Sequence, residues 1–264
     1  MASFTAKDVQ ALRQSTGVGM LDAKRALEEN DGDIEEATQW LRVQGIAGAA
    51  KRGEREASQG AVAVVRQDAV AAIVELRCET DFVAKAAEFV ALADELAELV
   101  VSKGDTAAAE RQDEVDRLRT TLKENISIGR VERLEATGGE VLDTYLHQQA
   151  GRGVNAVAVV VRDGTQEQAH ELAVHIAFAK PAYLRRDDVP AADVAAERST
   201  VEEISRNEGK PEAALAKIVE GRMNGWFKER VLLEQPYVRD EKQTVAAWLG
   251  SAEVVRFAQV VVGS

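Results

Sequence analysis

The sequence predicts an α+β protein in which helical segments flank two β-hairpins. Residues 1–44 hold short apolar stripes at helical spacing, whereas residues 60–79 and 141–161 hold β-branched runs around short turns. A helical pattern follows each hairpin, and the second copy of this hairpin-plus-helix unit begins roughly 80 residues after the first. We therefore expect a duplicated core in which each copy places its helix over its own sheet.

The amino-acid composition argues against several classes of protein. The 264 residues carry 33 Lys and Arg against 45 Asp and Glu, so the net charge is −12. This acidity argues against a protein that coats nucleic acid, because phosphate binding requires clustered cations. Cys78 is the single cysteine, the N-terminal segment has no apolar run typical of a secretory signal, and no stretch approaches a membrane span. We expect a cytoplasmic protein with no nucleic-acid or membrane partner.

The first 44 residues predict three short helices. Thr5 and Asp8 have the spacing of a capping box, and the glycines of residues 16–19 end the first helix. Asp33 is the expected cap of the third helix. A core this small is marginal, so we expect the module to dock onto another surface. The residues expected to face its core are Val9, Leu12, Met20, Ala23, Ala26, Leu27, Ile34, Ala37, Trp40 and Leu41.

Residues 60–138 predict the first copy of the core. Thr80 follows the hairpin at the position of a helix N-cap, and Asp81 lies in the first helical turn, where a negative charge is favourable. The expected elements, in order, are strands at 61–65 and 69–76, a helix from Phe82 to Val101, a helix from Ala107 to Lys123 and a strand at 126–134.

The second copy is predicted to be interrupted by an inserted pair of helices. Its hairpin spans 141–161, and Thr165 caps a helix that ends near Ala179. Two helices with a narrow apolar stripe follow, separated by a stop at Gly209 and a restart at Pro211. The narrow stripe favours an antiparallel helical hairpin that protrudes from the core. A last strand at 253–262 is expected to return to the second sheet.

The sequence contains none of the usual motifs for phosphate, dinucleotide or hydrolase chemistry. His170 and His175 lie five positions apart, on different faces of the predicted helix, so a shared metal is not expected. Cys78 ends an apolar strand with no histidine near it in sequence, which favours an inert buried thiol over a nucleophile. We therefore expect a binding protein rather than an enzyme, with no metal and no cofactor.

The strand-to-helix junction at Thr80–Val83 is the candidate site, because a side chain in a first helical turn can project beyond the protein body. Two interpretations of Phe82 are open. Its spacing to Phe89 and Leu96 places it on their apolar stripe, which favours a core position. The alternative is an exposed aromatic anchor for a partner.

Four segments resemble the bacterial elongation factor Ts family. They are LRQSTGVGMLDAKRAL at 12–27, ELRCETDFVAK at 75–85, VEGRM at 219–223 and LEQPYV at 233–238. Arg77 and Arg239 depart from the residues usual at their positions in the family. The resemblance implies a ubiquitin-associated-like first domain with its linker over 1–55, a core N-subdomain over 56–138, a core C-subdomain over 139–188 and 235–264, and a coiled-coil-like hairpin over 189–234.

The resemblance also implies a guanine-nucleotide exchange factor that binds elongation factor Tu in its GDP-bound and nucleotide-free forms. Thr80, Asp81, Phe82 and Val83 would insert beside the nucleotide and dislodge Mg²⁺, with Phe82 outside the core as the wedge. Further partner contacts are implied for Arg13, Met20, Leu21 and His147. An adaptor whose three-helix module binds ubiquitin-like or nascent-chain partners remains an alternative, although it leaves Thr80–Val83 without a role.

Overall fold

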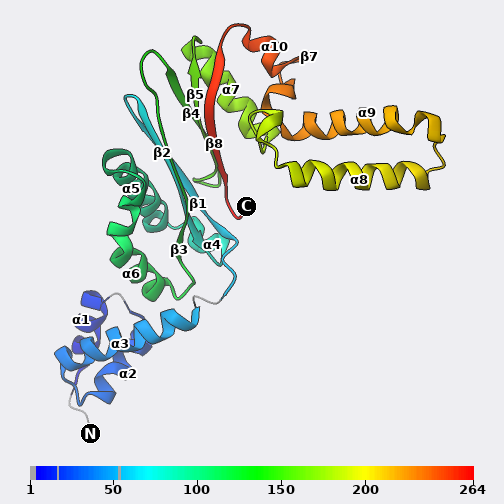
Figure 1. Ribbon diagram of the computed structural model, residues 1–264. Coiled ribbons are helices and arrows are strands. Elements are labelled where there is room, and N and C mark those ends of the chain that lie inside the picture. The colour runs from blue at the N-terminus through cyan, green and yellow to red at the C-terminus, as the bar shows by residue number, and fades with distance from the viewer. Residues whose placement is uncertain (1–3, 17, 53–54) are drawn as a thin grey trace.

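The computed structural model of the chain describes residues 4–16, 18–52 and 55–264. Figure 1 shows a helical module at the N-terminal end, a core with two sheets, and a pair of long helices that projects from the core. This arrangement confirms the predicted α+β class. None of the described helices is long and apolar enough to cross a membrane.

Two antiparallel sheets of three strands form the centre of the core. Helices α5 and α6 lie on the outer side of the first sheet, and α7 lies on the outer side of the second (Figure 1). The first sheet has the order β1 (Gln59–Gln67), β2 (Val70–Cys78) and β3 (Ser127–Glu135). The second has the order β4 (Val141–Gln149), β5 (Arg152–Arg162) and β8 (Glu253–Val261). The covering helices are α5 (Ala87–Lys103), α6 (Gln112–Leu122), which the short 3₁₀ helix η1 (Asp105–Arg111) precedes, and α7 (Gln166–Ala179).

The central strands β2 and β5 are buried on both faces. Ala71 and Ile73 of β2 belong to the apolar cluster shared by the two sheets, whereas Ala72 and Val74 belong to the cluster under α5. Strand β5 alternates in the same way between the shared cluster and the cluster under α7. Because successive side chains of a strand point to opposite faces, the two sheets pack face to face with helices outside. The core is therefore layered as helix, sheet, sheet and helix.

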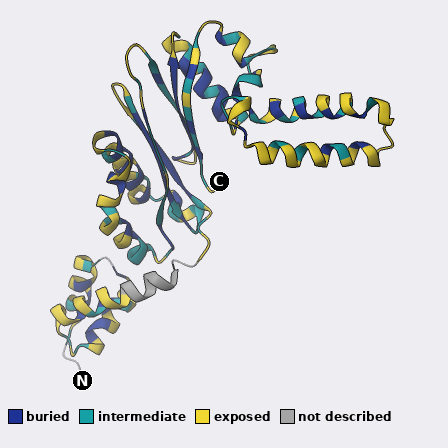
Figure 2. Ribbon diagram, in the orientation of Figure 1, coloured by how far each residue is buried: buried dark blue, intermediate teal, exposed yellow. Residues whose placement is uncertain are grey.

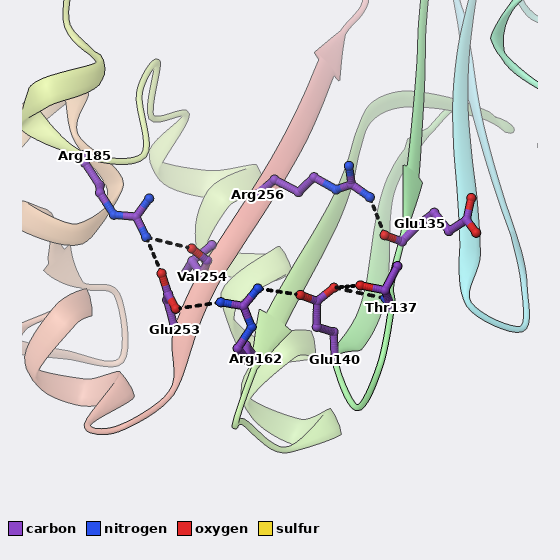
Figure 3. Close-up of polar contacts among 8 residues, drawn as sticks. All are labelled: Glu135, Thr137, Glu140, Arg162, Arg185, Glu253, Val254 and Arg256. Atoms are coloured by element: carbon purple, nitrogen blue, oxygen red, sulfur yellow. Dashed lines mark hydrogen bonds and ion pairs between the residues drawn. The ribbon is translucent and has the colours of Figure 1, made fainter.

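A chain of ion pairs crosses one end of the second sheet (Figure 3). Arg162, at the end of β5, donates to Glu140 at 2.8 Å and to Glu253 at 3.1 Å. Arg185 donates to the other carboxylate oxygen of Glu253 at 2.8 Å. Solvent screens exposed pairs of this kind, so their main effect is to orient the segments that carry them.

Two arginines connect the sheets to one another. Arg256 of β8 donates to the backbone carbonyl of Glu135 at the end of β3 (Figure 3). At the other end of the sheets, the buried Arg152 of β5 donates to the carbonyl of Gly60 in β1. Bonds from a charged donor are stronger than neutral ones, so these contacts help to hold the two sheets in register.

Glu75 is a fully buried carboxylate in β2, and its charge is compensated locally. Arg77 donates to it at 2.9 Å, and the backbone N–H groups of Arg130 and Gly263 donate at 3.2 and 3.0 Å. A Cβ atom at Gly129 would lie 2.4 Å from a carboxylate oxygen of Glu75. Arg77 therefore compensates a charge that burial would otherwise make costly.

The N-terminal module contains α1 (Ala6–Thr16), α2 (Met20–Glu29) and α3 (Ile34–Arg52). The predicted capping box is present, because Thr5 N donates to Asp8 at 2.7 Å and Asp8 N donates to Thr5 Oγ1 at 3.4 Å. Lys123, after α6, donates to Asp22 of α2 at 2.5 Å. The likeness to ubiquitin-associated domains and the domain limits given above stay predictions. The buried residues of the module are Val9, Leu12, Val18, Ala23, Ala26, Leu27, Ala37 and Leu41.

Helices α8 (Ala191–Asn207) and α9 (Glu212–Arg230) form the predicted protruding hairpin. Its narrow apolar seam includes Val201, Leu215 and Met223, and Figure 2 shows exposed residues along most of its remaining surface. Besides the 3₁₀ helix η3 (Leu232–Glu234), three further short elements between α9 and β8 are absent from the prediction because each is too brief to show periodicity. They are β6 (Pro236–Tyr237), β7 (Asp240–Thr244) and α10 (Val245–Leu249).

Candidate functional site

Strand β2 is followed by a single helical turn, α4 (Asp81–Ala84), which displays one aromatic ring. Thr80 is its extended N-cap residue, and Thr80 Oγ1 accepts a hydrogen bond from Val83 N at 3.4 Å. Ala84 is fully buried and Val83 packs against the core, whereas 83% of the Phe82 side chain is exposed. The buried Ala84 and the half-buried Val83 anchor the turn, and this orientation leaves the ring of Phe82 in solvent.

The predicted continuous helix from Phe82 to Val101 is wrong, because the chain breaks after α4. Ala86 is extended, with φ −64° and ψ 134°, and α5 begins at Ala87. The break changes the helical phase, so a spacing of seven residues no longer places Phe82 and Phe89 on one face. Phe89 is fully buried while Phe82 is exposed. The core interpretation of Phe82 is therefore wrong, and its contact with a partner stays a prediction.

The other members of the Thr80–Val83 turn already have partners within the chain. The hydroxyl of Thr80 donates to Glu124 at 2.5 Å. Asp81 accepts a hydrogen bond from Lys85 at 2.5 Å, and this bond is the main cause that holds the pKa of Asp81 below its usual value. Asp81 is therefore ionised at neutral pH. Thr80 and Asp81 form hydrogen bonds within the chain, whereas the exposed ring of Phe82 is the largest surface that the turn offers to a partner.

Cys78 is unsuited to nucleophilic chemistry. Its side chain is fully buried, and its Sγ donates to the carbonyl oxygen of Thr80 at 3.2 Å. Burial raises the pKa of the thiol to about 12. Because the thiolate is the reactive form, the thiol is inert at neutral pH, in agreement with the sequence-based expectation.

The N-terminal module exposes two apolar side chains at the start of α2: Met20, which was expected in the core stripe, and Leu21, which was expected only as a partner contact. Met20 is 52% exposed and Leu21 is 82% exposed, both in the first turn of α2. Ile34, which was also expected to face inward, is 42% exposed. Arg13, in the last turn of α1, is exposed as well. The prediction that Met20 and Ile34 pack in the core is wrong: each is the first residue of its helix, α2 and α3 respectively, and each is exposed. The buried residues of α2 are Ala23, Ala26 and Leu27.

His147 is exposed on β4 and lines a depression with Arg152 and Phe178. The Phe178 side chain is 75% exposed near the end of α7, and the sequence analysis missed it. The sequence signal for an exposed Phe178 was that this aromatic residue lies off the apolar stripe of α7. The charge of Arg152 also contributes, after the Lys85 hydrogen bond, to the low pKa of Asp81. Gln59 also lines the depression and pairs with Cys78 at the end of β2, so the depression lies beside the strand end that leads into the Thr80–Val83 turn.

His175 is a buried histidine on the inner side of α7. Its Nδ1 accepts a hydrogen bond from Val238 N at 3.3 Å, and its Nε2 lies 3.0 Å from Oε1 of Gln235. This pairing requires the neutral tautomer with the proton on Nε2. Burial is the main cause that lowers the pKa of His175, and the hydrogen bond to Gln235 opposes it. His170, by contrast, is exposed and lies 3.0 Å from Asp143.

The buried His175 predicts a loss of stability in mild acid. Its pKa is lower in the folded than in the unfolded chain, so below its usual value of 6.5 the unfolded state binds more protons. The free energy of unfolding should then fall with decreasing pH, by at most about 1.4 kcal/mol per pH unit for one proton. Urea unfolding between pH 5 and 8 measures this slope. His175→Gln should flatten this slope; a slope equal to that of the wild type would contradict the assignment.

The fold and the site define a class of α+β protein with two stacked sheets and an aromatic ring displayed where a buried strand meets a helical turn. The family described as Elongation factor TS matches residues 79–264 of the chain. The elongation factor Ts of Clavibacter michiganensis subsp. michiganensis (strain NCPPB 382) is 48% identical, with all of both chains covered. That of Mycobacterium avium (strain 104) is 44% identical, with 100% of this chain and 99% of the relative covered. The chain belongs to the elongation factor Ts family, and it is a translation elongation factor.

Proposed function

We propose that this protein is the guanine-nucleotide exchange factor of elongation factor Tu in the cytoplasm. The observation that carries the proposal is the exposed ring of Phe82, held on a short turn between the buried strand β2 and helix α5, which packs one face on the core. The segment that holds this ring contains one of the four family-like motifs. The protein would bind elongation factor Tu with GDP, displace its Mg²⁺ and release GDP, and would make or break no covalent bond.

Contacts of the exposed Phe82 turn can supply the differential binding energy that nucleotide exchange requires. In GTPases, Mg²⁺ bridges the phosphates to a hydroxyl of the phosphate-binding loop, so its removal leaves phosphate charge unbalanced. A factor that binds the nucleotide-free partner more tightly than the GDP-bound partner must lower the affinity for GDP by the same ratio. A thousandfold change corresponds to about 4 kcal/mol. One well-buried aromatic side chain with its neighbouring contacts can contribute an amount of this order.

Further contacts are proposed on both sides of the turn. Met20, Leu21 and Arg13 of the N-terminal module form one candidate surface, because two apolar side chains are exposed there together. His147 belongs to a second candidate surface, in the depression that Arg152 and Phe178 also line. Each of these contacts would add affinity for elongation factor Tu, whereas Phe82 would act on the nucleotide site.

The proposal predicts accelerated release of GDP from elongation factor Tu. Elongation factor Tu is loaded with a fluorescent GDP, mixed with excess unlabelled GDP, and followed by stopped flow with and without this protein. A saturating amount should raise the release rate by about a hundredfold or more, which corresponds to about 2.7 kcal/mol of differential binding. Binding to elongation factor Tu with no change in the release rate would instead favour the adaptor function and overturn the proposal.

A further inference from the structure

The turn that displays Phe82 is held by a carboxylate from a distant segment. Glu124 lies between α6 and β3, and one of its oxygens, Oε2, accepts from the backbone N–H groups of Glu79 and Thr80, both at 3.0 Å. The other oxygen, Oε1, accepts from the hydroxyl of Thr80 at 2.5 Å. A single side chain thus accepts three hydrogen bonds from the two residues that precede α4.

The connection is reciprocal. Glu79 Oε1 accepts from the backbone N–H of Asn125 at 2.6 Å, and the side-chain amide of Asn125 donates to the carbonyl of Arg55 at 2.7 Å. The two segments therefore exchange carboxylate-to-backbone hydrogen bonds in both directions. Arg55, which precedes β1, is joined to the same cluster.

The hydrogen bonds to Glu124 pair backbone N–H groups that neither strand β2 nor helix α4 can pair. The pairing of β2 with its neighbours ends at Cys78, and α4 begins at Asp81. The N–H groups of Glu79 and Thr80 therefore lie beyond the strand pairing and ahead of the helix. Backbone N–H groups at such positions need another acceptor, and hydrogen bonds to a carboxylate are roughly twice as strong as neutral ones. A helix of four residues is also unstable by itself and depends on tertiary contacts for its position.

We infer that Glu124 is a positioning residue for nucleotide exchange. It holds the Thr80 turn so that Phe82 is presented in one orientation before the partner binds. Such preorganisation removes the cost of ordering the turn during binding, so the contact energy of the ring is available at the nucleotide site. This inference rests on the proposed function, since it assigns Glu124 a role in the action of Phe82. The side chain of Glu124 acts within its own chain, through Thr80.

The test compares GDP release by the wild type, Glu124→Ala, Glu124→Gln and the control Glu110→Ala. Glu110 is an exposed carboxylate of the same subdomain, paired with Lys103 far from the turn. Release rates are measured over a range of factor concentrations, so that the maximal rate and the half-saturating concentration are separated. Glu124→Ala should lower the maximal rate about tenfold, the scale of one ordered segment. Glu124→Gln, whose amide oxygen can still accept from both N–H groups, should recover much of the loss, and Glu110→Ala should match the wild type.

A second comparison distinguishes positioning from a general structural role. Because Glu124 is inferred to act through Phe82, the double variant Phe82→Ala with Glu124→Ala should release GDP no more slowly than Phe82→Ala alone. Additive losses would overturn the inference, as would a wild-type maximal rate in Glu124→Ala. If Glu124→Ala does not fold, Glu124→Asp replaces it, since that change keeps the carboxylate but shortens its reach to the N–H groups of Glu79 and Thr80.

Amide hydrogen exchange separates this inference from the proposed function. In the isolated protein, Glu124→Ala should speed exchange at Glu79 and Thr80 by tenfold or more, whereas Glu110→Ala should leave it unchanged. The wild type could fail to accelerate GDP release while Glu124→Ala still speeds amide exchange at Glu79 and Thr80. In that case the proposed function would be refuted, but the positioning of the turn by Glu124 would be supported. Unchanged protection at both amides would overturn the positioning role whatever the release assay showed.

Discussion

Phe82→Ala is expected to slow GDP release from elongation factor Tu by about 30-fold or more, which corresponds to about 2 kcal/mol for a central aromatic contact. The thermal unfolding midpoint should stay close to that of the wild type, because 83% of the side chain is exposed and little core packing is lost. Stopped-flow release and a thermal scan of the same preparations measure both quantities.

Phe89→Ala is the matched control for this prediction. It makes the same chemical change seven residues along the chain, but at a fully buried position under the first sheet. Truncation of a buried phenylalanine costs about 3–5 kcal/mol of stability. Phe82→Ala should therefore lose nucleotide exchange activity and keep its stability, whereas Phe89→Ala should lose stability. A large stability loss in Phe82→Ala, or an unchanged release rate, would refute the role of the ring.

Gly153→Ala is expected to destabilise the core by about 2–3 kcal/mol, because the two sheets approach closely at this residue. A Cβ atom there would lie 2.1 Å from the backbone oxygen of Val62 in β1 and 2.7 Å from a methyl carbon of Leu146. A backbone oxygen cannot move aside as a side chain can, so the sheets would have to separate. The thermal unfolding midpoint, followed by circular dichroism, measures the effect.

Gly221→Ala is the control for the glycine change, with an effect of opposite sign. Gly221 lies within α9, and an added Cβ atom would meet nothing within 4 Å. Alanine is favoured over glycine in a helix interior by about 0.8–1 kcal/mol, so this variant should be slightly more stable than the wild type. A Gly153→Ala protein as stable as Gly221→Ala would contradict the close packing of the sheets.

Local signals in the sequence were sufficient for most of the fold. Runs of β-branched residues around short turns marked both hairpins, and Thr165 marked the start of α7, where the capping box is present. The packing of one sheet on the other was not predicted. The apolar runs of β2 and β5 were its signal, since a strand covered on one face alone would alternate with polar residues.

The candidate site shows where sequence patterns are insufficient. Lys85 and Ala86 are good helix formers and neither is glycine or proline, so nothing local marks the break after α4. Burial of Ala84 against the core and the hydrogen bonds of Glu124 to Glu79 and Thr80 decide the geometry instead. These contacts join residues more than 40 positions apart, and only the folded chain brings them together.

The central claim is that the ring of Phe82 acts by displacing Mg²⁺ from elongation factor Tu, and the magnesium dependence of GDP release tests it most directly. Release is measured with the wild type and with Phe82→Ala, first in millimolar Mg²⁺ and then with Mg²⁺ removed by EDTA. The wild type should be faster by about 30-fold or more with Mg²⁺ present, and the two proteins should become nearly equal once the ion is gone. If the ratio of the release rate with the wild type to that with Phe82→Ala stays the same without Mg²⁺, the claim is contradicted.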